Sequence, residues 1–566
     1  MCALLQMLVA RLRWLLNIVW RRPEAPQAIA AVVSARSTSI LDLNHDVLLM
    51  IFAYLRHRQQ LEVSTACRRF REVLVPRIYS RVIWVPGLRA FPHEYMWPHI
   101  RRLRMIGHEE LTDERRVELA SELAGAIHTM RFLRDFTIED VQDGLWTELL
   151  DVFQAARSPV MLDLRSAWVP EDYDQPVRLN SKLTGIPISE VDYLLSFVFD
   201  ELGNTMRRPD ELLEIEGGNL RNLLGTCRER IQSVSLPGDL LVRAFDAESP
   251  WPALKSLFVE GFWPAEHRLG MGDEAESSGA TSLLSLLEAM PNLRRLVLTL
   301  LSHETDPGNL LPIISADASS HPSIPESFLR GLEEFDGTAL ASGERLLDFL
   351  PAGLRSLTLR MYPLIDPRPR RAVHASITPS ILLDSLERAT FSSLQTLNIW
   401  YTIKSLEHLE DEEPLLSALP RLFPDLQHLE LHRRWAHQAT GLAGHWDPIP
   451  RLRVLLSQFE DLRTVKLNIS HPERTRRQPF MYETEEYFAH LRRLYALAEE
   501  VTADAPSLES ASMYREFGHD RTLYWETWSV GKDDEGTRLL EPRPRPPFDA
   551  QPEIENEGGE NDAGDE

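Results

Sequence analysis

The segment LRSLTL, residues 354–359, spaces three leucines in the pattern Leu-x-x-Leu-x-Leu. Its second and third leucines alternate with polar residues, and this two-residue period is that of a β-strand with one buried face. Clear copies recur as LRRLVL (293–298), LQTLNI (394–399), LQHLEL (426–431) and LRTVKL (462–467). From residue 354 onward the clear copies start 40, 32 and 36 residues apart, a longer and less regular spacing than that of a compact repeat.

Weaker copies extend the series in both directions. One copy alone is weak evidence, but a long series predicts that a single structural unit is repeated along the chain. The weaker copies are IRRLRM from Ile100, LRDFTI from Leu133, IQSVSL from Ile231, LKSLFV from Leu254, LESASM from Leu508 and, as a degenerate candidate, LEEFDG from Leu332. Residues 166–230 contain no clear copy, and their structure stays unassigned.

Helical segments precede the strand patterns. In SLLSLLEAMPN (282–292) and PLLSALPRLFPD (414–425), apolar residues recur at helical spacing, although we expect Pro420 to shorten or bend the second helix. The apolar side of the first segment consists of Leu283, Leu284, Leu287 and Met290. A helix followed by a strand, repeated with no copy able to bury its own face, predicts an α/β fold in which residues 95–515 form an irregular, curved solenoid. This series resembles leucine-rich repeats. The polar insertions 265–282 and 302–327 are expected to be loops.

A different pattern occupies LNHDVLLMIFAYL, residues 43–55. Five of its apolar residues make one stripe on a helix, and Asn44 is a suitable N-cap with Asp46 in the first turn. A second helical segment spans residues 61–84, with Leu61, Ala66, Phe70 and Leu74 at helical spacing and Pro76 interrupting the pattern. Together they predict a small helical module at residues 40–85, which carries more apolar surface than so short a chain can bury.

The stretch from Leu43 to about Val82 resembles an F-box, the helical module that docks on a Skp-family adaptor in cullin-type ubiquitin ligases. The family's Leu-Pro-x-Glu/Asp opening corresponds to residues 43–46, its Cys-Arg-x-Trp/Phe motif to residues 67–70, and PRIYSRV (76–82) to an ending common in fungal members. Asn44 departs from the usual Pro, but both residues suit a helix start. The resemblance implies adaptor contacts by Leu43, Asp46, Val47, Leu48, Ile51, Phe52, Leu55, Cys67 and Phe70. The alternative is an ordinary helical hairpin packed against the larger domain.

The two ends of the chain differ from its middle. Residues 1–39 form an extension whose apolar run is broken by Arg11 and Arg13, so a signal peptide or membrane span is not predicted. An amphipathic or loosely ordered extension and a mitochondrial presequence within residues 1–36 remain alternatives. Residues 516–541 alternate apolar and polar residues around GKDDEG and predict a capping β-hairpin, in which Trp525 and Trp528 pack. The Pro-rich, acidic tail 542–566 is expected to be disordered.

The composition of the chain argues against several classes of function. The 566 residues include 61 Lys+Arg and 85 Asp+Glu, and a net charge of −24 argues against a general nucleic-acid or acidic-membrane binder. Three cysteines, Cys2, Cys67 and Cys227, are too few for a disulfide framework or zinc site. A reducing compartment, cytoplasmic or nuclear, is therefore expected. The sequence also lacks a nucleophile elbow, a phosphate-binding loop and a His-Glu-x-x-His motif, so we expect neither an enzyme nor a cofactor.

Polar residues between the buried leucines should face the concave side of the solenoid and form one strip. Its mixed charge and exposed Trp suit a protein target, with a plain solvated face as the alternative. The resemblance implies a substrate receptor linked through the adaptor to cullin and RING subunits, with no transmembrane segment. A leucine-rich scaffold without a ubiquitin role and an enzyme hidden in residues 166–230 are the other hypotheses. The residues proposed to meet the target are Arg360, Asn398, Trp400, Glu430, His432 and Lys466, with Thr358 and Asn468 in the same strip.

Overall fold

The computed structural model divides into two compact units, Met1–Ile78 and Tyr79–Glu566, which are described separately below. The N-terminal extension 1–39, both polar insertions except Ser302, and the tail beyond residue 542 lie outside the described residues. The structure describes residues 40–55, 57–107, 111–141, 144–165, 168, 177–194, 198–199, 205–206, 210–263, 283–302, 328–338, 344–360, 377–435, 442–445, 447–469, 485–515, 524–532 and 538–542.

The first unit is helical. A short 3-10 turn, Ile40–Asp42, precedes α2 (His45–Phe52), α3 (His57–Ser64) and α4 (Arg68–Ile78). Asn44 caps α2 as predicted, since its side-chain oxygen accepts from the Val47 backbone N–H at 2.8 Å. Pro76 does not end α4, which continues to Ile78.

The second unit is built on a sheet of sixteen described strands whose spatial order is their chain order. Neighbours are parallel from β1 to β16, and the last two strands pair antiparallel. The strands are β1 (Arg81–Trp84), β2 (Arg102–Ile106), β3 (Asp135–Glu139), β4 (Val160–Arg165), β5 (Ile188–Leu194), β8 (Ser233–Pro237), β9 (Ser256–Trp263), β10 (Arg295–Ser302), β11 (Glu334–Thr338), β12 (Ser356–Arg360), β13 (Thr396–Ile403), β14 (His428–Trp435), β15 (Thr464–Ile469), β16 (Ser510–Arg515), β17 (Tyr524–Lys532) and β18 (Arg538–Pro542). A separate two-stranded sheet pairs β6 (Val198–Phe199) with β7 (Thr205–Met206).

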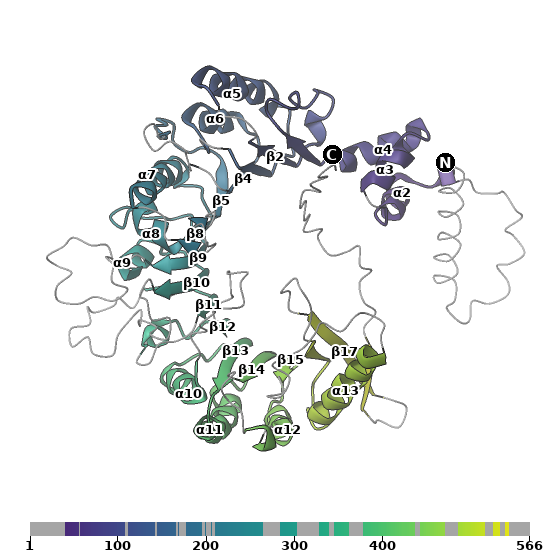
Figure 1. Ribbon diagram of the computed structural model, residues 1–566, viewed down its shortest axis with the longest axis vertical. Coiled ribbons are helices and arrows are strands. Elements are labelled where there is room, and N and C mark those ends of the chain that lie inside the picture. The colour runs from purple at the N-terminus through teal and green to yellow at the C-terminus, as the bar shows by residue number, and fades with distance from the viewer. Residues whose placement is uncertain are drawn as a thin grey trace, which may run out of the picture. The chain divides into compact units, whose positions relative to one another are not determined.

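Helices connect most of the strands and lie along the same side of the sheet (Figure 1). We call the opposite side the strand face. The helices are α5 (Asp113–Ile127), α6 (Thr147–Val152), α7 (Asp210–Cys227), α8 (Gly238–Ala244), α9 (Leu283–Glu288), α10 (Pro379–Arg388), α11 (Leu406–Leu422), α12 (Ile449–Ser457) and α13 (Glu485–Thr502). Short 3-10 turns lie at Trp97–His99, Phe153–Ala155, Leu346–Phe349 and Ala443–His445. The long, mostly parallel sheet covered by helices is the arrangement of a leucine-rich-repeat solenoid.

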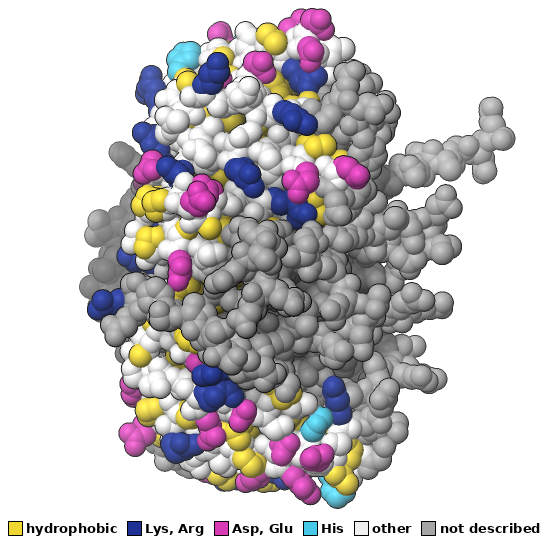
Figure 2. All heavy atoms as spheres, turned by 90° about the vertical axis from the view of Figure 1, so that its left-hand side faces the viewer, with side chains coloured by type: hydrophobic (Ala, Val, Ile, Leu, Met, Phe, Trp, Pro, Cys, Tyr) yellow, Lys and Arg dark blue, Asp and Glu magenta, His cyan; other side chains and the backbone are white. Residues whose placement is uncertain are grey.

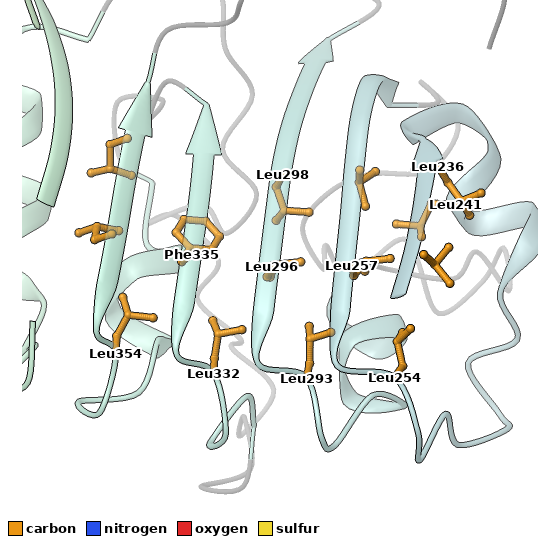
Figure 3. Close-up of a cluster of buried hydrophobic side chains, with 14 of the residues drawn as sticks. Leu236, Leu241, Leu254, Leu257, Leu293, Leu296, Leu298, Leu332, Phe335 and Leu354 are labelled. Carbon is orange, nitrogen blue, oxygen red and sulfur yellow. The ribbon is translucent and has the colours of Figure 1, made fainter. Parts of the chain in front are cut away.

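The core is a set of leucine rows that cross the strands in register. Leu357 lies opposite Leu397, Leu397 opposite Leu429, and Leu429 opposite Val465. Figure 3 shows the same arrangement in β8 to β12, where the first leucine of each motif fills the turn below its strand and the next two point toward the helices. These side chains are at most a few per cent exposed, and burying each one contributes about 1.5–3 kcal/mol. The rows explain why the motif recurs, because each copy completes the core of its neighbour.

Each predicted strand copy forms a strand, including the degenerate one in β11. Strands β4 and β5 of the main sheet were missed in the gap between the copies of β3 and β8, and the short β6 and β7 in the same gap were not predicted either. Strand β5 replaces the leucines by Ile188, Val191 and Tyr193, which keep the spacing and the burial. Pro420 does not shorten its helix either: α11 runs through Pro414 and Pro420 to Leu422.

The boundary between the units differs from the predicted one. Residues 81–84, expected in the helical module, form the first strand of the sheet, paired in register with β2. At the other end β17 and β18 pair antiparallel, with Trp528 buried in the core. Of the helices that the structure describes, none combines the length and the apolar character needed to span a membrane.

Candidate protein-binding surfaces

The helical unit has a small core that includes two residues predicted to meet the adaptor. Leu48 and Phe52 are 0% and 1% exposed, and the Phe52 ring packs edge-on against Phe70 at 5.2 Å. Gln60 donates from Nε2 to the carbonyl oxygens of Phe52 and Leu55, which ties the end of α2 to α3. The structure therefore places Leu48 and Phe52 inside the module, where they hold its helices together instead of facing outward.

The other predicted adaptor residues lie at the surface to different degrees. Asp46 is exposed, and the rest are half-buried: Leu43, Val47, Ile51, Leu55, Cys67 and Phe70. Cys67 is not on a helix but precedes α4, where its Sγ accepts from the Phe70 backbone N–H at 3.4 Å. Their adaptor contacts stay a prediction.

Sequence reasoning did not assign the most exposed apolar residues of the module to a partner. Met50 is 61% exposed and Tyr54 60%, while Leu41 and Leu61 are about 40% exposed. Met50 and Tyr54 are four residues apart and thus neighbours along the end of α2. The signal was present, because Met50 falls off the apolar stripe and cannot share the core with Leu48 and Phe52. We call Leu41, Met50, Tyr54 and Leu61 the apolar set of the module.

On the strand face of the second unit, a polar and aromatic cluster crosses β13 to β17. Its centre is His432, whose ring stacks on Trp400 at 3.7 Å with an interplanar angle of 14°. Trp400 donates from Nε1 to Asn398 Oδ1 at 3.0 Å. Trp525 meets His432 edge-on at 5.4 Å and Tyr514 at 5.6 Å. The cluster arises because register places Trp400 opposite His432 and Tyr514 opposite Trp525.

His432 is held in one neutral form. It is 0% exposed, its Nε2 lies 2.8 Å from Glu430 Oε1, and its Nδ1 lies 3.3 Å from the Asn468 amide nitrogen. Since the amide nitrogen can only donate, Nδ1 accepts and Nε2–H donates to the carboxylate. Burial lowers the pKa of His432, and Glu430 offsets this only in part.

Glu430 links the histidine to a cation. Burial alone would raise the pKa of Glu430, but His432 and Lys466 outweigh burial and leave that pKa below its ordinary value. Lys466 Nζ lies 3.2 Å from Glu430 Oε2 and 5.5 Å from the centre of the Trp525 ring, so it joins the ion pair to the aromatic group. Lys466 keeps 46% of its side chain exposed.

The predicted strip is thus assembled in part. Asn398, Trp400, Glu430, His432 and Lys466 form one connected cluster, whereas Arg360 pairs instead with Asp336 on β11 at 3.0 Å. His432 is covered, so it can support Trp400 but not contact a partner itself. Trp525 was missed as a member because the antiparallel return of β17 has no mark in the leucine pattern, whereas Tyr514 lies on β16 directly after the copy LESASM and could have been found.

Aromatic rings and one ion pair make up most of this cluster. Among the described residues, no three His, Cys, Asp or Glu side chains gather in a way that could hold a metal ion. The members that keep some exposure are the half-buried Trp400 and Trp525 and the exposed Lys466, and Trp is among the side chains that dominate the energetics of protein interfaces.

Comparisons with known proteins add little to these observations. No protein-family model and no curated protein matches the sequence. Among solved structures, the yeast complex of Rad7 and Elc1 matches at 14% identity and a TM-score of 0.33, covering 79% of this chain and 92% of that one. The leucine-rich repeat-containing protein LegL7 from Legionella pneumophila matches at 14% identity and a TM-score of 0.27, covering 62% and 91%. At these scores neither likeness carries an argument about function.

Proposed function

We propose that this protein is a substrate receptor of a cullin-type ubiquitin ligase. The helical unit would dock on a Skp-family adaptor and, through it, on cullin and RING subunits, while the second unit would hold a target protein. The chain itself would catalyse no covalent step. It would contribute by holding the target close to the site of ubiquitin transfer. The carrying observation is the apolar set of the module, which remains exposed in a unit whose motif order resembles an F-box.

The exposed residues direct the test of adaptor binding. Charges at Leu48 or Phe52 would disrupt the core of the module, so loss of binding in such variants would say nothing about docking. The double variant Met50→Asp and Tyr54→Asp alters side chains that are about 60% exposed and leaves the core in place. Val454→Asp, at a position 57% exposed on α12 of the other unit, is the matched control.

We expect the wild-type chain and the control to retain a co-expressed Skp-family adaptor at moderate salt, and the double variant to lose at least nine-tenths of it. Circular dichroism must show the same helix content in all three. If the wild-type chain does not retain the adaptor, the ligase role is wrong and a protein-binding scaffold is the function left. If the double variant retains the adaptor, the docking surface does not include Met50 and Tyr54.

Target binding is assigned to the exposed part of the cluster on β13 to β17. A partly accessible Trp in this cluster suits a protein partner, since Trp is among the residues that often dominate binding energy. Trp400→Ala should lower the recovery of proteins that co-purify with the chain from cells with a blocked proteasome, and Leu406→Ala, 51% exposed on α11, should not. Equal recovery of co-purifying proteins in both variants would mean that the cluster is a solvated face without a role in target binding.

A further inference from the structure

A row of side chains follows the amino ends of the parallel strands. It consists of the residues directly after the first leucine or isoleucine of each motif. In the row are Arg101, Arg134, Gln232, Lys255, Arg294, Glu333, Arg355, Gln395, Gln427, Arg463 and Glu509, six cations against two acids. Lys255, Arg294 and Arg355 follow leucines that Figure 3 labels at the lower ends of their strands. Backbone hydrogen bonds join successive members, such as Arg294 N–H to Lys255 O at 2.8 Å, so the side chains leave the edge side by side.

A groove runs along part of this edge. Two hollows of about 680 and 410 Å³ share Pro159 and Ser189 in their linings and therefore lie next to each other along the edge. Together they extend from the start of β3 to the start of β11, across seven neighbouring strands. At about 4.8 Å per strand the groove is roughly 29 Å long, the span of about nine residues of extended chain.

The groove contains more available cations than acids. Its cations are Arg131, Arg134, Arg230, Lys255 and Arg294, and its acids are Asp135, Glu190, Glu229 and Glu333. Three of these acids already face an arginine: Asp135 lies 2.6 Å from Arg102, Glu229 3.7 Å from Arg228, and Glu333 3.5 Å from Arg294. Within the part of the chain that the structure describes, Arg131, Arg134 and Arg230 form no ion pair.

The strand face shows the opposite arrangement. There, cations pair with acids across neighbouring strands, as in Arg295 with Glu334 at 3.2 Å and Arg360 with Asp336 at 3.0 Å. On the helical side seen in Figure 2, cations and acids are interspersed over the described surface. In a chain of net charge −24, unpaired arginines along one groove are a local excess of positive charge. They are free to bind an anion without first breaking an ion pair.

We infer that this groove binds an extended, acidic polypeptide segment of a partner protein. Guanidinium groups bind carboxylates through two parallel hydrogen bonds. Three exposed prolines, Pro159, Pro252 and Pro291, recur along the groove and offer rigid apolar contacts between the cations. Nucleic acid fits less well, because Glu190, Glu229 and the net charge of the chain oppose a phosphate backbone. This inference does not depend on the ubiquitin-ligase proposal.

The test uses the full chain and a labelled nine-residue peptide of alternating Glu and Ala, followed by fluorescence anisotropy. Arg134→Glu with Arg230→Glu changes two unpaired groove cations. Arg421→Glu with Arg492→Glu makes the same change in charge at two exposed, ion-paired arginines outside the groove, on α11 and α13. We expect the groove variant to bind at least tenfold more weakly than the wild-type chain, and the control variant to stay within twofold.

Two further measurements complete the test. The same measurement is made on a chain in which the seven acids of residues 551–566 are changed to Gln or Asn, so that this segment cannot compete. Absence of binding in both backgrounds, or equal losses in the groove and control variants, overturns the inference. A nine-nucleotide oligo-dT that binds through Arg134 and Arg230 more tightly than the peptide also overturns it, in favour of nucleic acid. Binding that appears only with the altered tail still assigns an acidic peptide to the groove.

Discussion

The two units of the chain solve the problem of burying apolar side chains differently. In the second unit each strand adds its leucines to rows that neighbouring strands already supply, as in Leu357, Leu397 and Leu429. The helical unit has no such neighbours. Among its described residues, 40–55 and 57–78, six hydrophobic side chains are buried, whereas four large ones are exposed. A repeated element can therefore complete its core within the chain, while a short helical unit leaves surface that a partner can cover.

Besides its leucine rows, the second unit buries a network of charged and polar side chains. Glu412 on α11, 0% exposed, faces Arg433 of β14 and accepts a hydrogen bond from Tyr401 of β13 at 2.7 Å. Burial raises the pKa of Tyr401 well above its ordinary value, and the charge of Glu412 adds to this, so the phenol stays a donor. These buried charges are tolerated because they pair with each other and their polar atoms are hydrogen-bonded.

The largest expected effect comes from breaking this network. Glu412→Gln removes the buried carboxylate that accepts from Nε and Nη2 of Arg433, whose side chain is 1% exposed, and should cost about 3–5 kcal/mol of the free energy of unfolding. The adjacent Glu413→Gln, whose side chain is 59% exposed, should change it by less than about 0.5 kcal/mol. Urea denaturation followed by circular dichroism measures both. Equal effects would mean that the carboxylate of Glu412 is not the group that holds Arg433.

The second-largest expected effect concerns the core of the helical unit. Leu48→Ala should destabilise that unit by about 2–5 kcal/mol, because a fully buried leucine leaves a cavity. The leucine rows of the second unit should be unaffected. Limited proteolysis, with mass spectrometry of the fragments, distinguishes local unfolding of residues 40–78 from global unfolding. If Leu48→Ala abolishes adaptor binding while the module resists the protease as the wild type does, the side chain meets the adaptor and the assignment to the core is wrong.

The same contrast explains what the sequence could predict. The strands of the second unit followed from leucine spacing, because one row position recurs in every copy. Strand β5 was missed since Ile188, Val191 and Tyr193 keep the spacing but not the residue type. In the strip, register along parallel strands brought Asn398, Glu430 and Lys466 together as expected. The place of Trp525 depends on an antiparallel return, and the pairing of Arg360 with Asp336 on side-chain conformation, neither of which has a periodic signal.

A smaller effect is expected at the start of the module. Asn44 is the N-cap of α2 where the F-box family usually has Pro, so its contribution separates the two ways of starting this helix. Asn44→Ala should cost about 1 kcal/mol, because the Val47 backbone N–H loses its partner. Asn44→Asp should retain the cap and cost much less. Thermal denaturation of the two variants gives the difference, and equal losses would show that the hydrogen bond from Val47 is not what stabilises the helix start.

The smallest effect concerns pH and the cluster around His432. Because burial places the folded-state pKa of His432 below its ordinary value of 6.5, the unfolded chain binds the proton more readily, and stability must fall as pH drops below that value. Glu430 acts in the same direction at lower pH, since its folded-state pKa lies below the ordinary 4.5. Protonation of His432 would also turn Nδ1 into a donor facing the amide nitrogen of Asn468.

His432→Asn should therefore flatten the decrease in the urea midpoint between pH 7 and pH 5. His428→Asn, which removes a half-buried histidine on the same strand, is the control and should leave that decrease unchanged. A decrease of equal size in the wild type and in His432→Asn would mean that the pKa of His432 is the same in the folded and the unfolded chain, contrary to its burial beside Glu430.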